Sequence, residues 1–300
     1  MKVNLIKKIG LGILAIGLGT LMIQAVSEEI DGKNEKSENY IYKFPTAIDF
    51  AGEKTPLHIV DVKQRFDREM LVNVNWHSNT YLMIKRANAY FPIIEPILKK
   101  NDIPDDFKYL AVIESGLTNA RSSAGASGFW QFMSQTGKEY GMEVNENVDE
   151  RYHLEMATEA ACIYLKSSKE KLGSWSLAAA AYNAGLSGIS NKLNDQLVTD
   201  YYDLFLVEET SRYVFRILAM KEIMKNPEQY GFKVSPEEKY NLMPIKKVEV
   251  TTSIPSLAKF AQENGSNYKA LKLYNPWLRD TKLNNTTGKK YIIDIPTAGY

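Results

Sequence analysis

The chain has 300 residues, 44% of them hydrophobic, with 37 Lys and Arg against 36 Asp and Glu. This composition predicts a globular protein with one large or two smaller folded units. The net charge of +1 argues against nucleic-acid binding, because it provides no overall field that attracts a polyanion. The single cysteine, Cys162, excludes an internal disulfide, and the three histidines are too widely spaced to suggest a zinc site. We therefore expect no metal and no cofactor.

Residues 1–26 have the pattern of an export signal. Lys7 and Lys8 precede an apolar run from Ile9 to Val26. A basic segment before an apolar one is typical of a signal peptide, but the run is also close to the roughly 20 residues that span a bilayer. We expect a signal peptide or an N-terminal membrane anchor, with the folded part outside the cytoplasm.

The middle of the chain reads as a block of helices. Residues 27–60 are polar or mixed and are expected to form a linker or N-terminal extension. Over residues 66–100 the apolar side chains recur every three or four positions, which predicts helix with a break or kink at Pro92 and Pro96. Further helices are predicted over 105–115, 129–140, 154–172, 174–184 and 209–225. We assign this helical domain to residues 61–232.

The last part of the chain has a different pattern. Residues 244–297 read as a strand, two short helical pieces and a closing strand. We assign a separate βααβ module to residues 244–300. The predicted fold class is therefore mainly α, with a helical domain followed by a small βααβ module.

Glu114 is the first candidate for chemistry. It lies in the last turn of the helix predicted before Gly116, beside Leu110 and Ile113. Burial and the free carbonyl groups at a helix C-terminus both favour a protonated carboxyl, which is the form that a general acid needs near neutral pH. A surface glutamate at a helix end is the commoner occurrence, so Glu114 is a candidate only in combination with other residues.

Three other segments carry candidate binding groups. Gly128 ends a loop of small residues that permits a ligand to approach closely, and Gln131 follows it among aromatic side chains. Tyr182 and Asn183 occupy the last turn of an alanine-rich helix. Each segment would equally suit a surface turn or a packed core. In the third segment two residues four apart share a helical face, Glu209 and Tyr213. The same spacing joins a pair of arginines that we expect to be solvated, Arg212 and Arg216.

The order and spacing of these segments resemble a known family. Glu-Ser-Gly at 114–116, GASGFWQFM at 125–133, TEAACIYL at 158–165, AYNAG at 181–185 and EETSRYV at 208–214 together resemble the soluble-lytic-transglycosylase fold of glycoside hydrolase family 23. The resemblance covers roughly residues 95–225 and is closest to lytic murein transglycosylases of the membrane-bound D type. It implies a lysozyme-like, goose-lysozyme-type helical domain. Residues 246–297 resemble a divergent LysM module, with Leu257, Tyr274-Asn275-Pro276 and Ile295-Pro296 at the matching points.

The resemblance implies cleavage of peptidoglycan strands in the periplasm or cell envelope. The bond is the β-1,4 link between N-acetylmuramic acid and N-acetylglucosamine, and the product has a 1,6-anhydromuramyl end. By this resemblance Glu114 is the catalytic acid and then base, and Tyr182 holds its carboxyl by a hydrogen bond. The residues that it assigns to substrate binding are Ser115, Gly128, Gln131, Tyr182, Asn183, Glu209 and Tyr213.

Two other functions stay open. A goose-type lysozyme-like hydrolase has the same fold but needs a group that activates water, and the sequence identifies no second carboxylate for this. A non-catalytic peptidoglycan-binding protein would use both domains to hold glycan. The presence of Glu114, Gln131, Tyr182 and Asn183 argues against the purely binding protein.

Overall fold

The computed structural model describes residues 42–298. The predicted signal peptide or anchor and the first part of the expected linker lie outside the described residues. Within residues 42–298 no helix is both long enough and apolar enough to cross a membrane.

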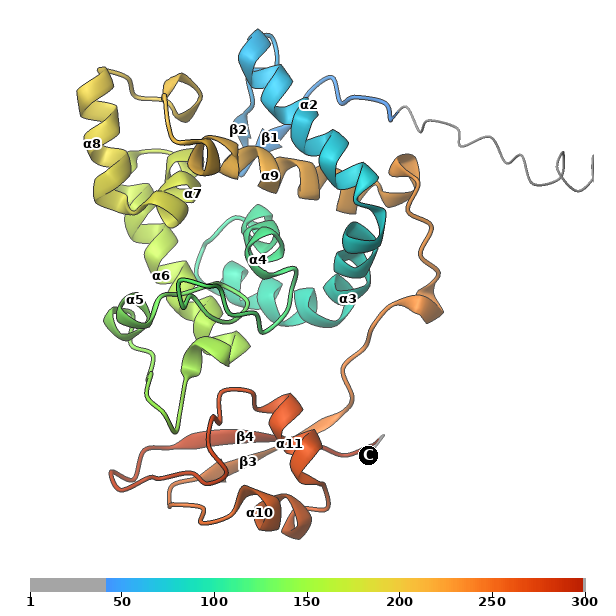
Figure 1. Ribbon diagram of the computed structural model, residues 1–300, viewed down its shortest axis with the longest axis vertical. Coiled ribbons are helices and arrows are strands. Elements are labelled where there is room, and N and C mark those ends of the chain that lie inside the picture. Colours follow the sequence, from blue (N-terminus) through green and yellow to red (C-terminus); the bar gives the residue numbers. More distant parts are fainter. Residues whose placement is uncertain (1–41, 299–300) are drawn as a thin grey trace, which may run out of the picture. The chain divides into compact units, whose positions relative to one another are not determined.

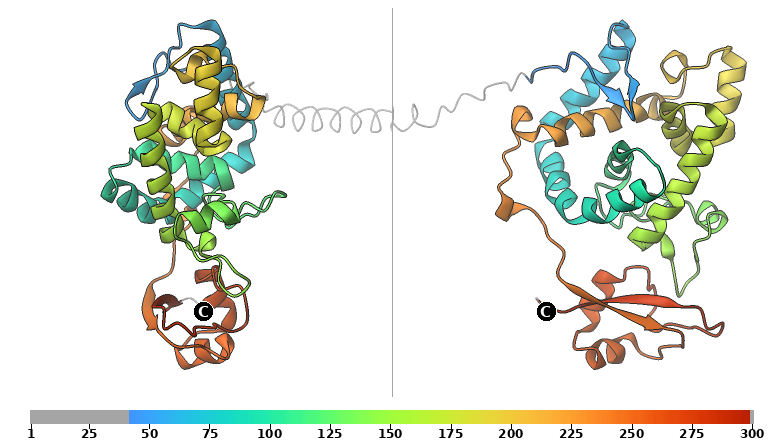
Figure 2. Two further views of the ribbon diagram at one scale, coloured as in Figure 1. Left: turned by 90° about the vertical axis from the view of Figure 1, so that its left-hand side faces the viewer. Right: turned by 180° about the vertical axis from the view of Figure 1, so that it is seen from behind.

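The first part of the described chain is a helical domain, as predicted. Its helices are α2 (Val60–Asn75), α3 (His77–Lys100), α4 (Lys108–Ser115), α5 (Ser134–Glu139), α6 (Leu154–Leu172), α7 (Trp175–Ala184), α8 (Leu186–Gln196) and α9 (Glu208–Lys225). Figures 1 and 2 show α4 in the middle of the domain, with α3, α6, α7 and α9 around it. This position follows from the composition of α4: Leu110, Ala111 and Val112 are all buried, and a helix that is apolar on several sides has to be enclosed.

The expectation of a linker up to residue 60 is wrong for its last part. A short hairpin, β1 (Asp49–Phe50) and β2 (Glu53–Lys54), folds onto the helical domain, and the Phe50 side chain is fully buried. The Glu53 carboxylate accepts hydrogen bonds from the backbone N–H groups of Trp175 and Ser176, at 2.6 and 2.9 Å. It thereby satisfies free donors in the first turn of α7, as an N-capping side chain does.

Two details of the predicted helices differ in the structure. Of the break or kink expected at Pro92 and Pro96, the break is wrong, because α3 is one continuous helix, but Figure 2 shows that this helix bends along its length. Burial of Ile94 and Leu98 on its inner side keeps it helical, and the chain breaks instead before α3, at Trp76. The helix predicted over 129–140 is limited to α5, because the chain before it turns through a positive φ at Gln131.

The C-terminal module has the predicted βααβ order. It consists of β3 (Ile245–Val250), α10 (Leu257–Glu263), α11 (Tyr268–Tyr274) and β4 (Tyr291–Pro296). The two strands are antiparallel, with Ile245 opposite Pro296 and Val250 opposite Tyr291. Leu257 and Leu271 of the two helices are fully buried against this ribbon.

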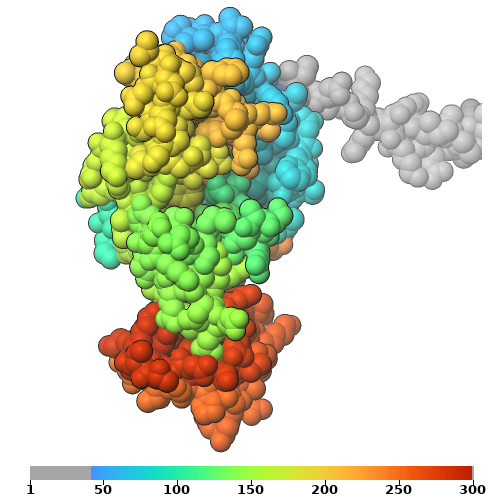
Figure 3. Space-filling view, turned by 60° about the vertical axis from the view of Figure 1, so that its left-hand side comes forward, coloured from blue at the N-terminus to red at the C-terminus, as the bar shows by residue number. Residues whose placement is uncertain are grey.

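The module is not separate from the helical domain. The segment 143–153, between α5 and α6, places Val148 and Tyr152 in the hydrophobic core of the module. The Asp149 N–H also donates to the Trp277 carbonyl at 2.9 Å. Figure 3 shows this green segment lying directly against the red surface of the module. Residues 44–298 accordingly belong to one compact unit, because the two parts share apolar burial and backbone hydrogen bonds.

Candidate active site

The Glu114 carboxyl lies at the C-terminal end of α4, where Gly116 ends the helix with a φ of 59°. The Tyr213 hydroxyl, from α9, donates a hydrogen bond to its Oε1 atom. Burial raises the pKa of Glu114, and the negative charge of Glu209 acts in the same direction, whereas the Tyr213 hydrogen bond and the Arg216 charge oppose it. The raised pKa agrees with the expected protonated acid.

Tyr182 does not hold the Glu114 carboxyl, contrary to the expectation from the family resemblance. Its hydroxyl donates to the Trp130 carbonyl at 2.8 Å, because the end of α7 directs it toward the loop that carries Trp130. Burial and the negative charge of Glu114 raise the pKa of Tyr182 well above its ordinary value. The Tyr182 hydroxyl is therefore close enough to Glu114 to interact with it electrostatically, but its hydrogen bond goes to the Trp130 carbonyl.

Asn183 and Glu209, both assigned to substrate binding by the family resemblance, are in contact in the structure. The Asn183 amide donates to Glu209 Oε1 at 3.1 Å, and the Thr210 hydroxyl donates to Asn183 Oδ1 at 2.8 Å. These bonds connect the end of α7 to the first turn of α9. They fix the direction of the Glu209 carboxylate, which interacts electrostatically with Glu114.

Gln131 and Gly128 shape the loop before α5. The Gln131 amide nitrogen donates to the carbonyls of Gly128 and Ala120, at 2.7 and 3.1 Å. Among the described residues no hydrogen bond joins Gln131 to Glu114. At Gly128, with a φ of 81°, an added Cβ would lie 1.9 Å from the Arg151 carbonyl oxygen. Gly128 is therefore required because the Arg151 backbone packs against it, and not because a ligand approaches it closely, as the sequence had suggested.

A cavity of about 840 Å³ opens beside the end of α4, between α2, α3 and α9. Ser115 and Glu209, both predicted for the site, line it. Polar and charged side chains make up most of its lining, together with apolar residues such as Met83 and Val112. Trp76, which also lines it, has 59% of its surface exposed. A polar lining with an exposed indole is a composition that suits a polar ligand with a flat face.

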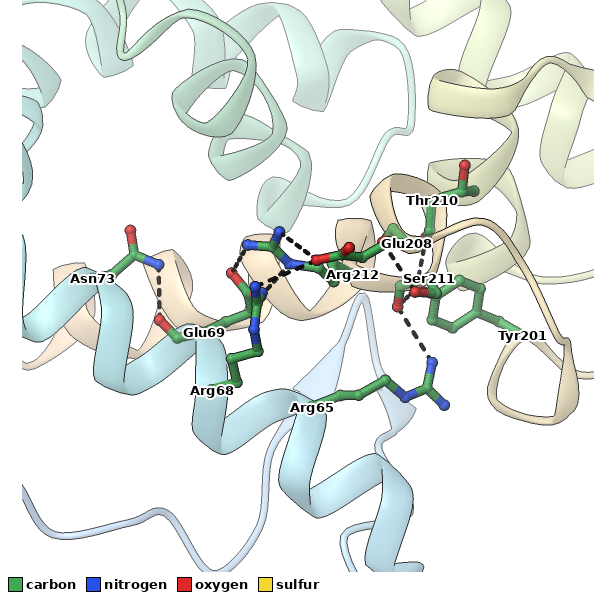
Figure 4. Close-up of polar contacts among 9 residues, drawn as sticks. All are labelled: Arg65, Arg68, Glu69, Asn73, Tyr201, Glu208, Thr210, Ser211 and Arg212. Atoms are coloured by element: carbon green, nitrogen blue, oxygen red, sulfur yellow. Dashed lines mark hydrogen bonds and ion pairs between the residues drawn. The ribbon is translucent and has the colours of Figure 1, made fainter.

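A buried ion-pair network, which was not predicted from the sequence, fixes one wall of this cavity. Glu69 of α2 is 1% exposed and accepts hydrogen bonds from Arg212 Nε at 2.7 Å and from Arg68 at 2.8 Å. Arg212 also lies 3.4 Å from Glu208, and Figure 4 shows these side chains joining α2 to α9. The signal in the sequence is that Glu69 lies among the apolar residues of the inner face of α2. A buried carboxylate is costly unless a cation pairs with it, so this position indicates a basic partner from another element.

The expectation that Arg216 is solvated is also wrong. Arg216 is half-buried one turn after Tyr213, and its Nη2 donates to the Ile113 carbonyl at 2.8 Å. The spacing of Tyr213 and Arg216 puts both on one face of α9, but only the packing of α9 against α4 brings that face to Glu114.

Comparison with known proteins agrees with this fold and these motifs. Residues 91–204 match the Transglycosylase SLT domain, and residues 246–299 match the Soluble lytic transglycosylase C-terminal LysM-like domain. Over 214 residues the chain is 28% identical to Membrane-bound lytic murein transglycosylase D of Escherichia coli K12, and to the protein of the same name from Escherichia coli O6:H1. Each match covers 69% of this chain and 46% of the relative, so the chain spans about half the length of the curated relatives it matches. The predicted lysozyme-like helical fold and LysM-like module are confirmed.

Proposed function

We propose, from the SLT transglycosylase domain and the LysM-like domain that this chain carries, that it is a peptidoglycan lytic transglycosylase with Glu114 as its one catalytic carboxyl. The observation that carries the proposal is the Glu114 carboxyl at the end of α4, with a raised pKa and a hydrogen bond from Tyr213. A carboxyl in this state can give up a proton near neutral pH and can also be stabilised after it has done so.

The proposed reaction uses this carboxyl twice. Protonated Glu114 gives its proton to the glycosidic oxygen as the bond from muramyl C1 breaks through an oxocarbenium-like state. The resulting carboxylate, stabilised by Tyr213 and by the charge of Arg216, then removes the proton from the muramyl 6-hydroxyl. That oxygen attacks C1 and forms the 1,6-anhydro bond. Because the nucleophile belongs to the substrate, no water is consumed and no second carboxylate is required.

The other predicted residues support this reaction in two ways. Ser115 and Glu209 line the cavity beside Glu114, and Asn183 holds Glu209, so we assign these three to one side of the glycan. Gly128 and Gln131 contribute indirectly: they stabilise the conformation of the loop whose Trp130 carbonyl accepts the Tyr182 hydrogen bond. The substrate is peptidoglycan strands in the cell envelope, reached by export or by membrane anchoring through the N-terminal residues.

Hydrolysis is the second candidate, and one observation favours it. Glu209 lies near enough to Glu114 to raise the pKa of that carboxyl, and it lines the cavity beside the end of α4, so it is the carboxylate that would activate a water molecule. Its hydrogen bond from Asn183 argues for a fixed, structural carboxylate instead.

Analysis of the products distinguishes these functions. Purified peptidoglycan is digested, and the released muropeptides are treated with borohydride and analysed by mass spectrometry. The transglycosylase gives anhydro ends that resist reduction, the hydrolase gives reducible ends, and a protein that only binds releases nothing. A Glu114→Gln protein that still releases anhydro ends would overturn the assignment of the acid.

A further inference from the structure

Two arginines enclose the end of the helix that carries Glu114. Arg86, from α3, donates through Nη1 to the Gly116 carbonyl at 3.0 Å, and Arg216, from α9, donates through Nη2 to the Ile113 carbonyl at 2.8 Å. Cations are favoured at this position because the last carbonyl groups of a helix have no partner within it. The contacts therefore hold both guanidinium groups beside the candidate acid.

Neither guanidinium forms an ion pair in the described part of the chain, although the charge of Arg216 acts on the nearby Glu114 carboxyl. No carboxylate lies within the 4.0 Å ion-pair distance of Arg86 or Arg216, and each donates one hydrogen bond. The neighbouring Arg212 differs, because it is paired with Glu69 and Glu208, as Figure 4 shows. A guanidinium group has five N–H donors, so most of those on Arg86 and Arg216 remain available to a ligand.

Both side chains face a ligand-sized space. Arg86 and Arg216 line the cavity of about 840 Å³ together with Ser115, the residue after Glu114. Both are half-buried, which weakens the competition from water for an anion. Of the acidic groups that line this cavity, Glu69 and Glu208 are paired with Arg212 and Arg68, and Glu209 accepts a hydrogen bond from Asn183.

We propose that Arg86 and Arg216 bind a carboxylate of the muramyl substituent, either the lactyl group itself or the peptide stem attached to it. This proposal rests on the proposed function. It adds a physical reason why the site distinguishes N-acetylmuramic acid from N-acetylglucosamine. N-acetylmuramic acid and N-acetylglucosamine share a ring and an acetamido group, and the muramyl residue alone carries an acidic substituent. A planar guanidinium is well suited to a carboxylate, so the pair directs the muramyl residue toward Glu114.

Binding measurements on Glu114→Gln protein test this without relying on cleavage. Calorimetry compares three tetrasaccharides: alternating N-acetylglucosamine and N-acetylmuramic acid with free lactyl groups, the same glycan with peptide stems, and N-acetylglucosamine alone. We expect at least one carboxylate-bearing glycan to bind about tenfold more tightly than the uncharged one. The advantage should shrink as salt is raised. A preference for one charged glycan or the other identifies the lactyl or the stem carboxylate.

Substitution of the arginines locates the effect. In Arg86→Gln and Arg216→Gln proteins the preference should fall toward unity, while affinity for the uncharged tetrasaccharide is kept, which also reports that the cavity is intact. Arg279→Gln is the matched control, because Arg279 also donates to a backbone carbonyl, that of Pro276 at 2.9 Å, but lies in the C-terminal module. Equal affinity for all three glycans, or a preference that survives both substitutions, would overturn the proposal. Absence of anhydro products would instead overturn the proposed function and leave this result standing.

Discussion

The Tyr213 hydroxyl of α9 donates a hydrogen bond to the Glu114 carboxyl of α4, across 99 residues of sequence. This bond favours the carboxylate, whereas burial favours the protonated acid. The two opposing effects keep the group able both to donate and to accept a proton.

Replacing this tyrosine should change the pH dependence of the reaction. In Tyr213→Phe the carboxylate loses its donor, so the pKa of Glu114 rises further and the alkaline limb of the rate profile moves up by about one pH unit. The turnover rate should fall about tenfold or more, because the carboxyl also loses its orientation. Tyr182→Phe is the control: its hydroxyl bonds the Trp130 carbonyl, and its alkaline limb should not move. An upward shift in the control alone would reverse the roles of the two tyrosines.

Removing the Glu114 charge should stabilise the fold at high pH. Because burial raises the folded-state pKa above the unfolded value, wild-type stability decreases as pH rises from the unfolded pKa, about 4.3, through the folded one. Glu114→Gln is neutral throughout, so it should be the more stable protein near pH 8, and the difference should vanish well below about pH 4.

Urea unfolding at the two pH values measures this difference. Glu170→Gln, at an exposed position of α6, controls for the loss of one negative charge. If the Glu114 variant were the less stable protein near pH 8, the carboxylate would be the favoured form in the fold, and the acid assignment would lose its support.

The sequence predicted the elements around the site better than the contacts within it. The end of α4 could be recognised because apolar residues fill several of its faces and Gly116 follows. The sequence did not predict the hydrogen bond of Asn183 with Glu209, because it depends on how the end of α7 packs against the first turn of α9. Which tyrosine reaches Glu114 depends on how α7 and α9 pack against α4, and no spacing along either helix contains that information.

Two other features were missed because they depend on distant packing. The hairpin at 49–54 has strands of two residues each, which are too short for any alternation of polar and apolar side chains, and burial of Phe50 stabilises it. Glu69 and Arg212 are separated by 143 residues, so their ion pair follows only from the contact of α2 with α9. The same kind of tertiary burial keeps α3 continuous through Pro92 and Pro96, so the expected break does not occur.

The loop before α5 should be intolerant of one methyl group. In Gly128→Ala the new Cβ would lie 1.9 Å from the Arg151 carbonyl oxygen at a φ of 81°, so we expect destabilisation of roughly 2–5 kcal/mol. Gly125→Ala is the matched control: its φ is 91°, but no heavy atom lies within 4 Å, so only the backbone cost of about 1–2 kcal/mol applies. Chemical denaturation measures both, and equal losses would contradict the close approach at Gly128.

Substitution of either of two adjacent lysines, Lys289 and Lys290, tests how the C-terminal module is attached to the helical domain. Lys289 lies 2.8 Å from Glu143 and 2.6 Å from Glu150, whose side chain is 2% exposed. Lys289→Met leaves Glu150 without this cation, and because the lysine is itself part-exposed we expect a loss of about 1–3 kcal/mol. Lys290→Met removes only an exposed pair with Glu249 and should cost less than about 1 kcal/mol.

Thermal unfolding should further show one transition for both parts of wild-type protein, since they share core residues. A module that melts separately, with no difference between the Lys289 and Lys290 variants, would contradict the shared core.

The central claim is that the muramyl 6-hydroxyl, and not water, attacks C1 after Glu114 has donated its proton. Digestion of peptidoglycan in water labelled with heavy oxygen tests this most directly, with the released muropeptides analysed by mass spectrometry. If the 6-hydroxyl attacks, the anhydromuramyl ends carry no label. Incorporation of one labelled oxygen at each new muramyl end would contradict it and would identify a hydrolase.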